Sequence, residues 1–213
     1  MSLDYDWLSQ VKTVHIIGAG LNQDKPAHRA FIDAGHRGFR MVPVHPKAAG
    51  SSILGRPIVP HPWSTSYPEL FVVFLSPDTL FNQVRKWLIE GRNIPFLWLQ
   101  PGADNEDIID FLDNSNIKYS VGKCWVITIN EQDIFASNPS QILPWCLQTK
   151  SVDGSECSVW NYFSSGTDYI CDNPLEWVGD LLDLELSEES IPKYIRSLVK
   201  EGETLEDAAK RLS

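Results

Sequence analysis

Short apolar runs alternate with amphipathic stretches along the first 121 residues of the chain. The runs cover residues 14–17, 39–44, 70–75, 95–100 and 117–121. The stretches between them carry apolar side chains at helical spacing, most clearly Leu80, Val84, Trp87 and Leu88. Strands that alternate with helices are typical of an α/β fold, in which right-handed crossovers place helices on both faces of a parallel sheet. We therefore predict a doubly wound parallel sheet of about five strands.

The pattern changes after residue 125. Residues 126–129 (VITI) indicate a short edge strand, whereas residues 131–186 mix aromatic, acidic, Gly and Ser positions without a clear period. Helical spacing returns after Ser187, and Thr204 opens a capping-box-like start for a second helix. We expect an α/β domain at 1–130, an irregular aromatic and acidic connection at 131–186, and a two-helix tail at 187–213.

The turn after the first apolar run is the most informative feature of the sequence. Gly18-Ala19-Gly20 follows the run at once, so the backbone can turn sharply and leave peptide N–H groups uncovered. Lys25 and Pro26 then indicate a helix start, because proline is tolerated in the first helical turn. The free N–H groups and the dipole of a helix N-terminus attract anions. This combination predicts a phosphate-binding turn, whereas the purely structural interpretation is a pair of turn glycines.

Ligands of doubly wound sheets bind at the carboxyl ends of the strands, near the point where the strand order reverses. We expect the segments at these ends to converge on one crevice. They are Gly18-Ala19-Gly20, His45-Pro46-Lys47, Ser76-Pro77, Gln100-Pro101-Gly102 and Gly122-Lys123-Cys124. The stretch 45–62 is rich in Pro, Gly and Ser and is expected to be mainly loop, and a loop of this length indicates a function.

The net charge of −10 is unevenly distributed. Residues 1–150 carry 13 Lys and Arg against 14 Asp and Glu, whereas residues 151–213 carry 5 against 14. An acidic segment is a poor partner for nucleic acid, which is bound through clustered Lys and Arg. We therefore expect an anion site in the N-terminal part of the chain and no nucleic-acid partner.

Signals for several other classes of protein are missing from the sequence. The apolar runs are too short to cross a bilayer, and residues 1–10 have no basic region before an apolar core, so a cytoplasmic protein without a membrane partner is expected. The four cysteines form no C-x-x-C pair. His15 is interpreted as a core residue, and His28 and His36 as surface residues. No metal site and no catalytic group are predicted, because no nucleophile lies in a recognisable motif with a base.

A Gly-x-Gly turn after a strand is weak evidence by itself, so other positions must identify the ligand. The third glycine of the dinucleotide motif G-x-G-x-x-G would fall at Gln23. The acidic residue that holds the ribose of NAD is also missing, because the second apolar run is followed by His45-Pro46-Lys47. A lysine at this place favours a phosphorylated ribose, as in NADP and coenzyme A, and Lys25 adds a second positive charge beside the turn.

Five motifs across residues 12–129 resemble those of the small stand-alone CoA-binding protein family. That family is related to the nucleotide-binding domain of the succinyl-CoA synthetase alpha subunit. The motifs occur in the order of the family and at compatible spacing: IIGAGLNQDKPAHRAF, VPVHPKAAGSSILGRPIVP, VVFLSPDTL, FLWLQPGADNEDI and SVGKCWVI. The resemblance implies a Rossmann-like domain at residues 1–130 whose small-molecule ligand is coenzyme A or an acyl-CoA.

The resemblance also implies a role for each matching position. The residues implied around the pyrophosphate are Gly18, Ala19, Gly20, Asn22, Lys25, Pro26 and Ala27. Those implied on the side of the adenosine 3′-phosphate are Val44, His45, Pro46 and Lys47. The adenine is expected against the backbone of Leu75, Ser76 and Pro77. Gln100 and Gly102 match a further ligand loop, and Lys123 and Cys124 lie near the pantetheine end. The sequence departs from the family at Gln23, which replaces a proline, at Ala27, which replaces a serine, and at His45, which replaces an asparagine.

Three functions remain open on the sequence alone. The first is a non-catalytic CoA or acyl-CoA binding protein that acts as a sensor or regulatory module. The second is an NADP-dependent oxidoreductase, against which the missing third glycine argues. The third is a nucleotide-responsive regulator, because residues 194–213 resemble the first two helices of a helix-turn-helix, although the acidic charge argues against DNA binding.

The tail is expected either to pack on the domain or to form a homo-oligomer. Cys124 is interpreted as a buried thiol, with a thiolate stabilised beside Lys123 as the alternative.

Overall fold

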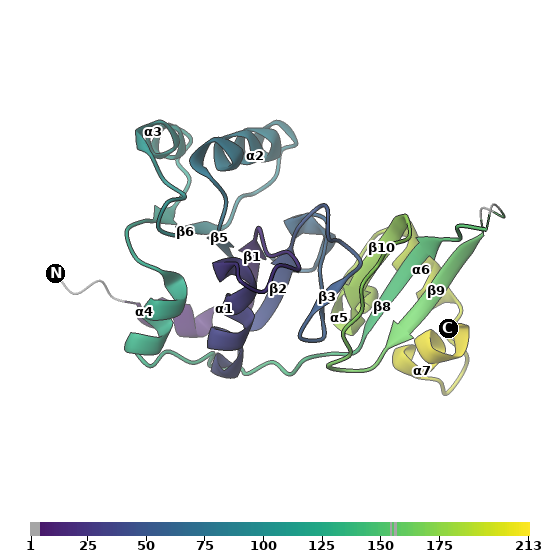
Figure 1. Ribbon diagram of the computed structural model, residues 1–213. Helices are drawn as coiled ribbons and strands as arrows, with labels where there is room; N and C mark the ends of the chain where they lie inside the picture. The colour runs from purple at the N-terminus through teal and green to yellow at the C-terminus, as the bar shows by residue number, and fades with distance from the viewer. Residues whose placement is uncertain (1–4, 154, 156) are drawn as a thin grey trace. The chain divides into compact units, whose positions relative to one another are not determined.

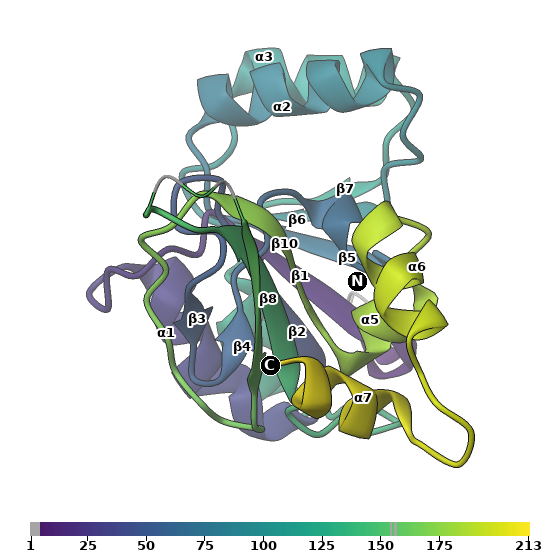
Figure 2. The ribbon, with the colours of Figure 1, turned by 90° about the vertical axis from the view of Figure 1, so that its right-hand side faces the viewer.

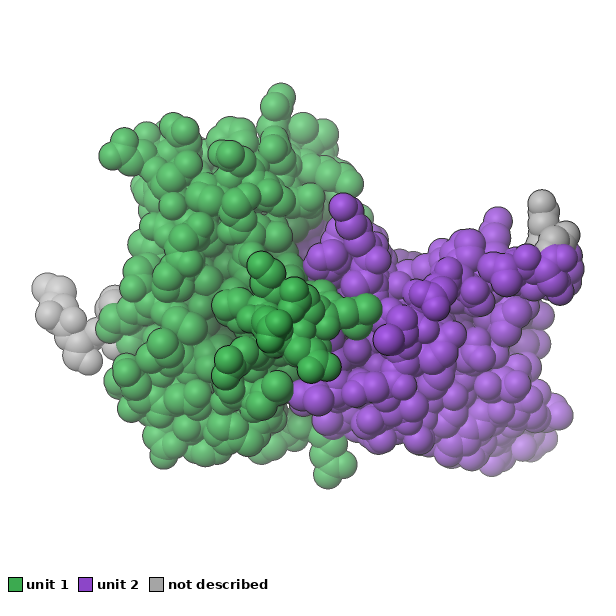
Figure 3. Space-filling model, in the orientation of Figure 1, with its two compact units in different colours: residues 1–41, 68–141 green, residues 42–67, 142–213 purple. Residues whose placement is uncertain are grey.

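The computed structural model describes residues 5–153, 155 and 157–213 (Figure 1). The chain divides into two compact units, each built from two stretches of sequence (Figure 3). Unit 1 comprises residues 1–41 and 68–141, and unit 2 comprises residues 42–67 and 142–213. The segment 42–67 therefore belongs to the same compact unit as the C-terminal part of the chain.

Unit 1 is built on a parallel sheet. Among the described residues, the strand order in this sheet is β2-β1-β5-β6-β7. The strands are β1 (Thr13–Ile17), β2 (Arg40–Val44, whose residues 42–44 are counted with unit 2), β5 (Leu70–Val73), β6 (Phe96–Leu99) and β7 (Tyr119–Ser120). The pairs β1–β5, β5–β6 and β6–β7 are parallel. Every residue of β1 and β5 is buried, as expected for parallel strands that are covered on both faces.

Helices cover both faces of the sheet, which confirms the predicted doubly wound α/β fold. They are α1 (Pro26–Ala34), α2 (Pro77–Ile89), α3 (Glu106–Asn114) and α4 (Trp125–Glu131). Helices α2 and α3 pack side by side on one face, and α1 and α4 pack together on the other (Figures 1 and 2). In the part of the chain that the structure describes, no helix combines the length and apolar character needed to span a membrane.

The edge strand predicted at residues 126–129 is wrong, because this segment lies in α4. Its β-branched residues have high strand propensity, but tertiary packing decides the outcome. Trp125, Thr128 and Ile129 recur at helical spacing and are buried, and α4 packs against α1. Trp125 also contacts Phe39, with ring centroids 5.7 Å apart.

Unit 2 contains an antiparallel sheet with strand order β10-β8-β9. Its strands are β8 (Trp145–Lys150), β9 (Ser158–Phe163) and β10 (Leu175–Asp180), and its helices are α5 (Leu181–Leu186), α6 (Ser190–Ser197) and α7 (Leu205–Leu212). The prediction of an irregular connection at 131–186 is therefore wrong, since these strands and α5 lie within it. The predicted pair of helices after residue 187 is confirmed as α6 and α7, with α6 beginning at Ser190 rather than Ser187.

The helices of unit 2 pack on its sheet through one apolar cluster. The buried members of this cluster are Cys146, Trp177, Leu184, Ile195 and Ala209. They come from β8, β10 and all three of the helices named for this unit. The tail thus buries its apolar face on the sheet of its own unit, whereas the sequence predicted that it packs on the α/β domain or forms a homo-oligomer. Self-association through the tail stays a prediction.

The segment 42–67 is tied to residues near 170 by backbone and side-chain hydrogen bonds. It contains the short antiparallel pair β3 (Ser52–Ile53) and β4 (Arg56–Pro57). The Ser52 N–H donates to the Tyr169 carbonyl at 2.9 Å, and the Gly55 N–H donates to the Asp168 carboxylate at 2.7 Å. A side chain at Gly55 would collide with the backbone, because its Cβ would lie 2.3 Å from the Gly166 Cα. The loop predicted to carry a function is therefore held by the C-terminal part of the chain.

Candidate nucleotide-binding site

The glycine turn lies directly after β1, as predicted. Gly18 has a φ of +97°, a backbone conformation that L-residues with side chains rarely adopt. An added Cβ would lie 3.3 Å from both the Leu75 Cδ2 and the Phe74 carbonyl oxygen. Gly18 is therefore required both by its conformation and by the close approach of the segment that follows β5.

This contact places the turn where the order of the strands reverses. From β1 the chain continues to β2 on one side, whereas β5 on the other side leads to β6 and β7. The Phe74 N–H donates to the Ile17 carbonyl at 2.9 Å, so the pairing continues to the ends of both strands. In doubly wound folds the crevice at this reversal is the usual ligand site. The structure thus brings together two parts of the predicted site, Gly18 and Leu75.

The first turn of α1 lies beside the glycine turn, because His28 connects them. The ring Nδ1 of His28 lies 3.0 Å from the Gly20 carbonyl oxygen. A carbonyl oxygen can only accept, so the His28 Nδ1 carries the proton and donates. His28 is buried, which shows that its interpretation as a surface residue is wrong. Sequence reasoning missed this residue, although its place on the inner face of α1, three residues before Phe31, was a usable signal.

The N-terminus of α1 is open to an external anion. Lys25 is the N-cap residue and Pro26 occupies the first turn, as predicted, and no side chain caps the helix. Pro26 carries no N–H and the His28 N–H donates to the Lys25 carbonyl at 3.0 Å, so among the described residues the Ala27 N–H is the donor of this turn that is left for another acceptor. Lys25 is exposed and Ala27 is buried. The amide oxygen of Asn22 accepts a hydrogen bond from the Asp24 N–H at 3.0 Å, so in this structure Asn22 shapes the loop between the turn and the helix.

Two further predicted residues follow β6. The Gln100 N–H donates to the Val73 carbonyl at 3.1 Å, which fixes the backbone at the end of the sheet. Its side chain is only 4% exposed, yet the amide Nε2 has no hydrogen-bond partner among the described residues. An unmet buried donor costs about 1–3 kcal/mol, and buried groups of this kind normally have a partner. Gly102, with a φ of +89°, lies in the turn that follows.

The remaining residues expected at the ends of the unit 1 strands have mixed environments. Ser76 is the N-cap residue of α2, and its hydroxyl lies 2.8 Å from that of Thr79. Lys123 is exposed, and its carbonyl accepts a hydrogen bond from the indole N–H of Trp98 at 2.8 Å. Cys124, which the sequence indicated to be a buried thiol, is a half-buried free thiol at the N-cap of α4.

The four residues expected near the 3′-phosphate lie in unit 2. Val44 is buried at the end of β2 and forms a bridge to Val59, whereas Pro46 and Lys47 are exposed. The His45 Nδ1 accepts a hydrogen bond from the Lys47 N–H at 3.3 Å. Burial and the Lys47 charge lower the pKa of His45. The neutral imidazole therefore supplies no charge, and Lys47 is the cation of this loop. That Lys47 and Lys25 face one ligand stays a prediction.

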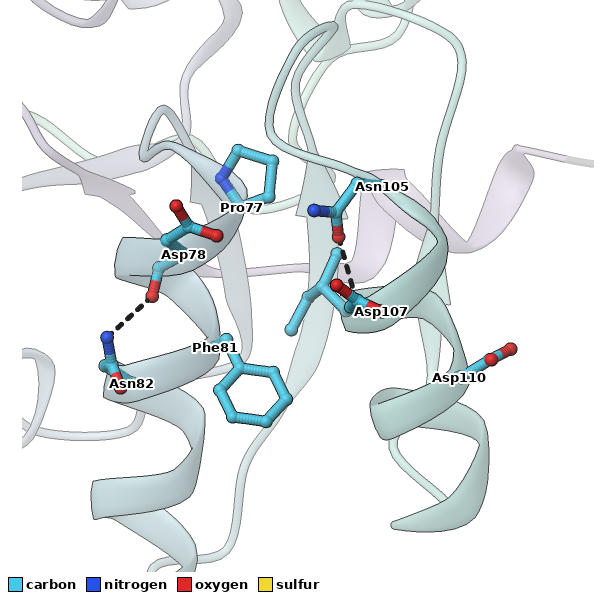
Figure 4. A pocket seen from close by; sticks show the side chains of 8 residues that line it. Pro77, Asp78, Phe81, Asn82, Asn105, Asp107 and Asp110 are labelled. Carbon is cyan, nitrogen blue, oxygen red and sulfur yellow. Dashed lines mark hydrogen bonds between the residues drawn. The ribbon is translucent and has the colours of Figure 1, made fainter.

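A cleft of about 480 Å³ lies between the first turns of α2 and α3 (Figure 4). Of the predicted site residues, Pro77 lines it. The cleft is rimmed by three carboxylates, those of Asp78, Asp107 and Asp110. Asp78 and Asp107 lie in the first turns of their helices, where a negative charge is stabilised by the helix dipole. Because these charges repel phosphate, the cleft is unsuited to the diphosphate of a nucleotide.

Comparisons with known proteins identify the family of the chain. A family model described as a CoA binding domain matches residues 12–130. A solved structure from Thermus thermophilus superposes with a TM-score of 0.52 at 25% identity, and the match covers 59% of this chain and 92% of that one. A conserved hypothetical protein from Pyrococcus furiosus is 26% identical, with a TM-score of 0.48 and coverage of 55% and 98%. Because the family model spans more than half of its residues, the chain belongs to the CoA-binding domain family.

Proposed function

We propose that this protein binds coenzyme A or an acyl-CoA without transforming it, and that it acts as a sensor or regulatory module. The observation that carries the proposal is the glycine turn in contact with Leu75 at the reversal of the strand order, in a chain of the CoA-binding domain family. The diphosphate would lie against the backbone of Gly18–Gly20 and the uncapped start of α1. Lys25 would add a positive charge.

The buried amide of Gln100 supports a ligand at the same edge of the sheet. Its N–H groups meet no acceptor among the described residues, and Gln100 follows β6, the neighbour of β5. A phosphate oxygen or a pantetheine carbonyl would satisfy them. The expected gain is the removal of a desolvation cost of about 1–3 kcal/mol that the ligand-free protein carries.

A regulatory role is supported by the way the Lys47 loop is held. Residues 45–67 are bonded to residues 168–171, and the Ser66 N–H donates to the buried Asp183 carboxylate at 3.0 Å. A ligand that orders Lys47 would therefore act on a loop that is anchored to the C-terminal sheet and helices of unit 2. Any differential affinity of the ligand for two arrangements of this unit would shift their populations.

The 3′-phosphate provides the sharpest test of the ligand. The full chain is titrated by calorimetry with CoA, dephospho-CoA and NADP. The comparison of CoA with dephospho-CoA measures the contribution of the 3′-phosphate, and the comparison of CoA with NADP tests which of the two cofactors is bound. We expect CoA to bind more tightly than dephospho-CoA, and the variant Lys47→Ala to bind CoA about tenfold more weakly, which corresponds to about 1.4 kcal/mol. The affinity of this variant for dephospho-CoA should be unchanged.

Lys118→Ala is the matched control, because Lys118 is an exposed lysine that directly precedes β7, at the amino end of the strand. It should bind CoA like the unchanged protein. Binding of NADP with no binding of CoA would contradict the proposal and favour an oxidoreductase. An equal loss of affinity in both lysine variants would contradict the role of Lys47, because it would indicate a nonspecific effect of charge.

A further inference from the structure

A second pocket, of about 530 Å³, lies entirely within unit 2. Its lining includes Lys47, His61 and Ser64 from the loop after β2, most of the residues between 171 and 178, and Glu189. Its volume is within the range of about 300–1,000 Å³ that is usual for small-molecule sites. Apart from Pro46 and Lys47, none of the residues that the family pattern assigns to CoA lines this pocket.

The charges around the pocket are unequal. Asp172, Glu176 and Glu189 contribute three carboxylates, and Lys47 contributes one ammonium group. Glu176 is held in place, because its carboxylate accepts a hydrogen bond from the Gln148 amide at 2.9 Å. Hydrogen bonds from Ser158 and Gln148 lower the pKa of Glu176, so this carboxylate is ionised near neutral pH. An occupant with two cationic groups and one anionic group would match this pattern.

The lining of the pocket offers one more donor. Trp177 lines it and is only 3% exposed, and its indole N–H has no acceptor among the described residues. The indole stacks on Trp160 with the ring centroids 5.8 Å apart, which restricts its orientation. A buried indole N–H is normally hydrogen-bonded, so it favours an acceptor oxygen in the occupant. Lys47 favours an acceptor of negative charge.

An organic cation suits the pocket better than a metal ion. Among the described residues, no group of three or more His, Cys, Asp or Glu side chains is placed to hold a metal ion. The three carboxylates of the pocket therefore do not converge on one point in the geometry that a metal ion needs. Separate positive groups on one molecule can meet them individually.

We propose that this pocket binds a small organic molecule with two cationic groups and one carboxylate, the charge pattern of a basic amino acid. Asp172, Glu176 and Glu189 receive the cationic groups, and Lys47 and the Trp177 N–H receive the carboxylate. The lining of this pocket includes no residue of the glycine turn, and the proposal does not require that CoA be bound.

Calorimetric titration of the full chain with L-arginine, in the absence of CoA, tests the proposal. Agmatine, which lacks the carboxylate, and L-glutamate, which lacks the second cation, are titrated in parallel. We expect L-arginine to bind, agmatine to bind at least about fivefold more weakly, and L-glutamate to give no binding. Asp172→Asn and Glu189→Gln should each weaken L-arginine binding about fivefold. Both positions are exposed, so these variants should retain the thermal stability of the unchanged protein.

Glu185→Gln is the control, because Glu185 is an exposed carboxylate of α5 that does not line the pocket. It should bind L-arginine like the unchanged protein. The proposal is overturned if L-arginine gives no binding heat, if agmatine binds as tightly as L-arginine, or if the two pocket variants behave like Glu185→Gln. Lys47 is left unchanged throughout, since it also belongs to the proposed CoA site.

Discussion

The replacement Gly18→Ala tests the glycine turn directly, because the structure separates two costs of a side chain at this position. The first is conformational, since a positive φ costs an L-residue about 1–2 kcal/mol. The second is steric, because the new Cβ would lie 3.3 Å from the Leu75 Cδ2 and from the Phe74 carbonyl oxygen. Overpacking of this kind costs about 1 kcal/mol or more. We expect Gly18→Ala to lower the free energy of unfolding by about 2–3 kcal/mol.

Gly91→Ala isolates the conformational cost. Gly91 has a φ of +68°, and an added Cβ would meet no atom within 4 Å. This variant should therefore lose about 1–2 kcal/mol, through backbone strain alone. Denaturant unfolding of the two variants, each compared with the unchanged protein, measures the difference between them.

The same pair of variants also separates stability from ligand binding. A methyl group at Gly18 displaces the backbone on which the diphosphate is proposed to lie, so CoA affinity should fall at least about tenfold. Gly91 lies beyond the end of α2 and away from the turn in the sequence, so Gly91→Ala should bind CoA normally. The reasoning is refuted if Gly18→Ala loses no more stability than Gly91→Ala and still binds CoA like the unchanged protein.

Three further predictions concern buried polar groups. His28→Leu should lower the free energy of unfolding by about 1–2 kcal/mol and weaken CoA binding, because the Gly20 carbonyl loses its donor. Thermal unfolding measures the first effect and calorimetry the second. The exposed control His36→Leu should change neither stability nor CoA binding. Asp183→Asn should lower the free energy of unfolding by about 2 kcal/mol, as measured with denaturant. An amide has one acceptor oxygen, whereas the Asp183 carboxylate accepts from the N–H groups of both Ser66 and Asp180. A loss no larger than that of Glu185→Gln on the same helix would contradict this role of the carboxylate. Burial, followed by the Arg40 charge, lowers the pKa of His15 from 6.5 to about 3. Between these values the unfolded chain binds one more proton at this site than the folded protein, so stability should fall by about 1.4 kcal/mol for each pH unit below 6.5. Denaturant unfolding at pH 7 and pH 5 should therefore show a smaller fall in stability for His15→Gln than for the unchanged protein. An equal fall in the two proteins would disprove the role of His15.

Sequence reasoning was reliable where local signals agreed with packing. The run at 70–75 is continuously apolar because β5 is covered on both faces, and Pro26 and Pro77 mark helix starts because they need no N–H partner there. These signals depend on a few neighbouring residues, so they survive without knowledge of the rest of the chain. The glycine turn and Leu75 were placed at one edge of the sheet for the same reason, since parallel strands share their carboxyl edge.

Local signals failed where distant segments cover one another. Strand β8 has buried residues on both of its sides, because Cys146 packs in the helical cluster while Leu147 approaches Gly50. A half-exposed sheet shows alternation of apolar and polar residues, and β8 does not, so no period was visible there. His28 was misjudged in a similar way, because its hydrogen bond to Gly20 depends on how α1 lies beside the turn.

The sequence by itself determined the α/β order, the glycine turn and the family, because strand periodicity, helix starts and motif spacing are properties of short segments. The tertiary structure alone decided that residues 42–67 join the C-terminal sheet and that Lys47 lines a second pocket with three carboxylates. It alone also decided that the Gln100 amide Nε2 is buried with no hydrogen-bond partner among the residues that the structure describes. These features arise from contacts between residues far apart in the chain. Their burial and charge balance are properties of the packed units, and no short stretch of sequence encodes them.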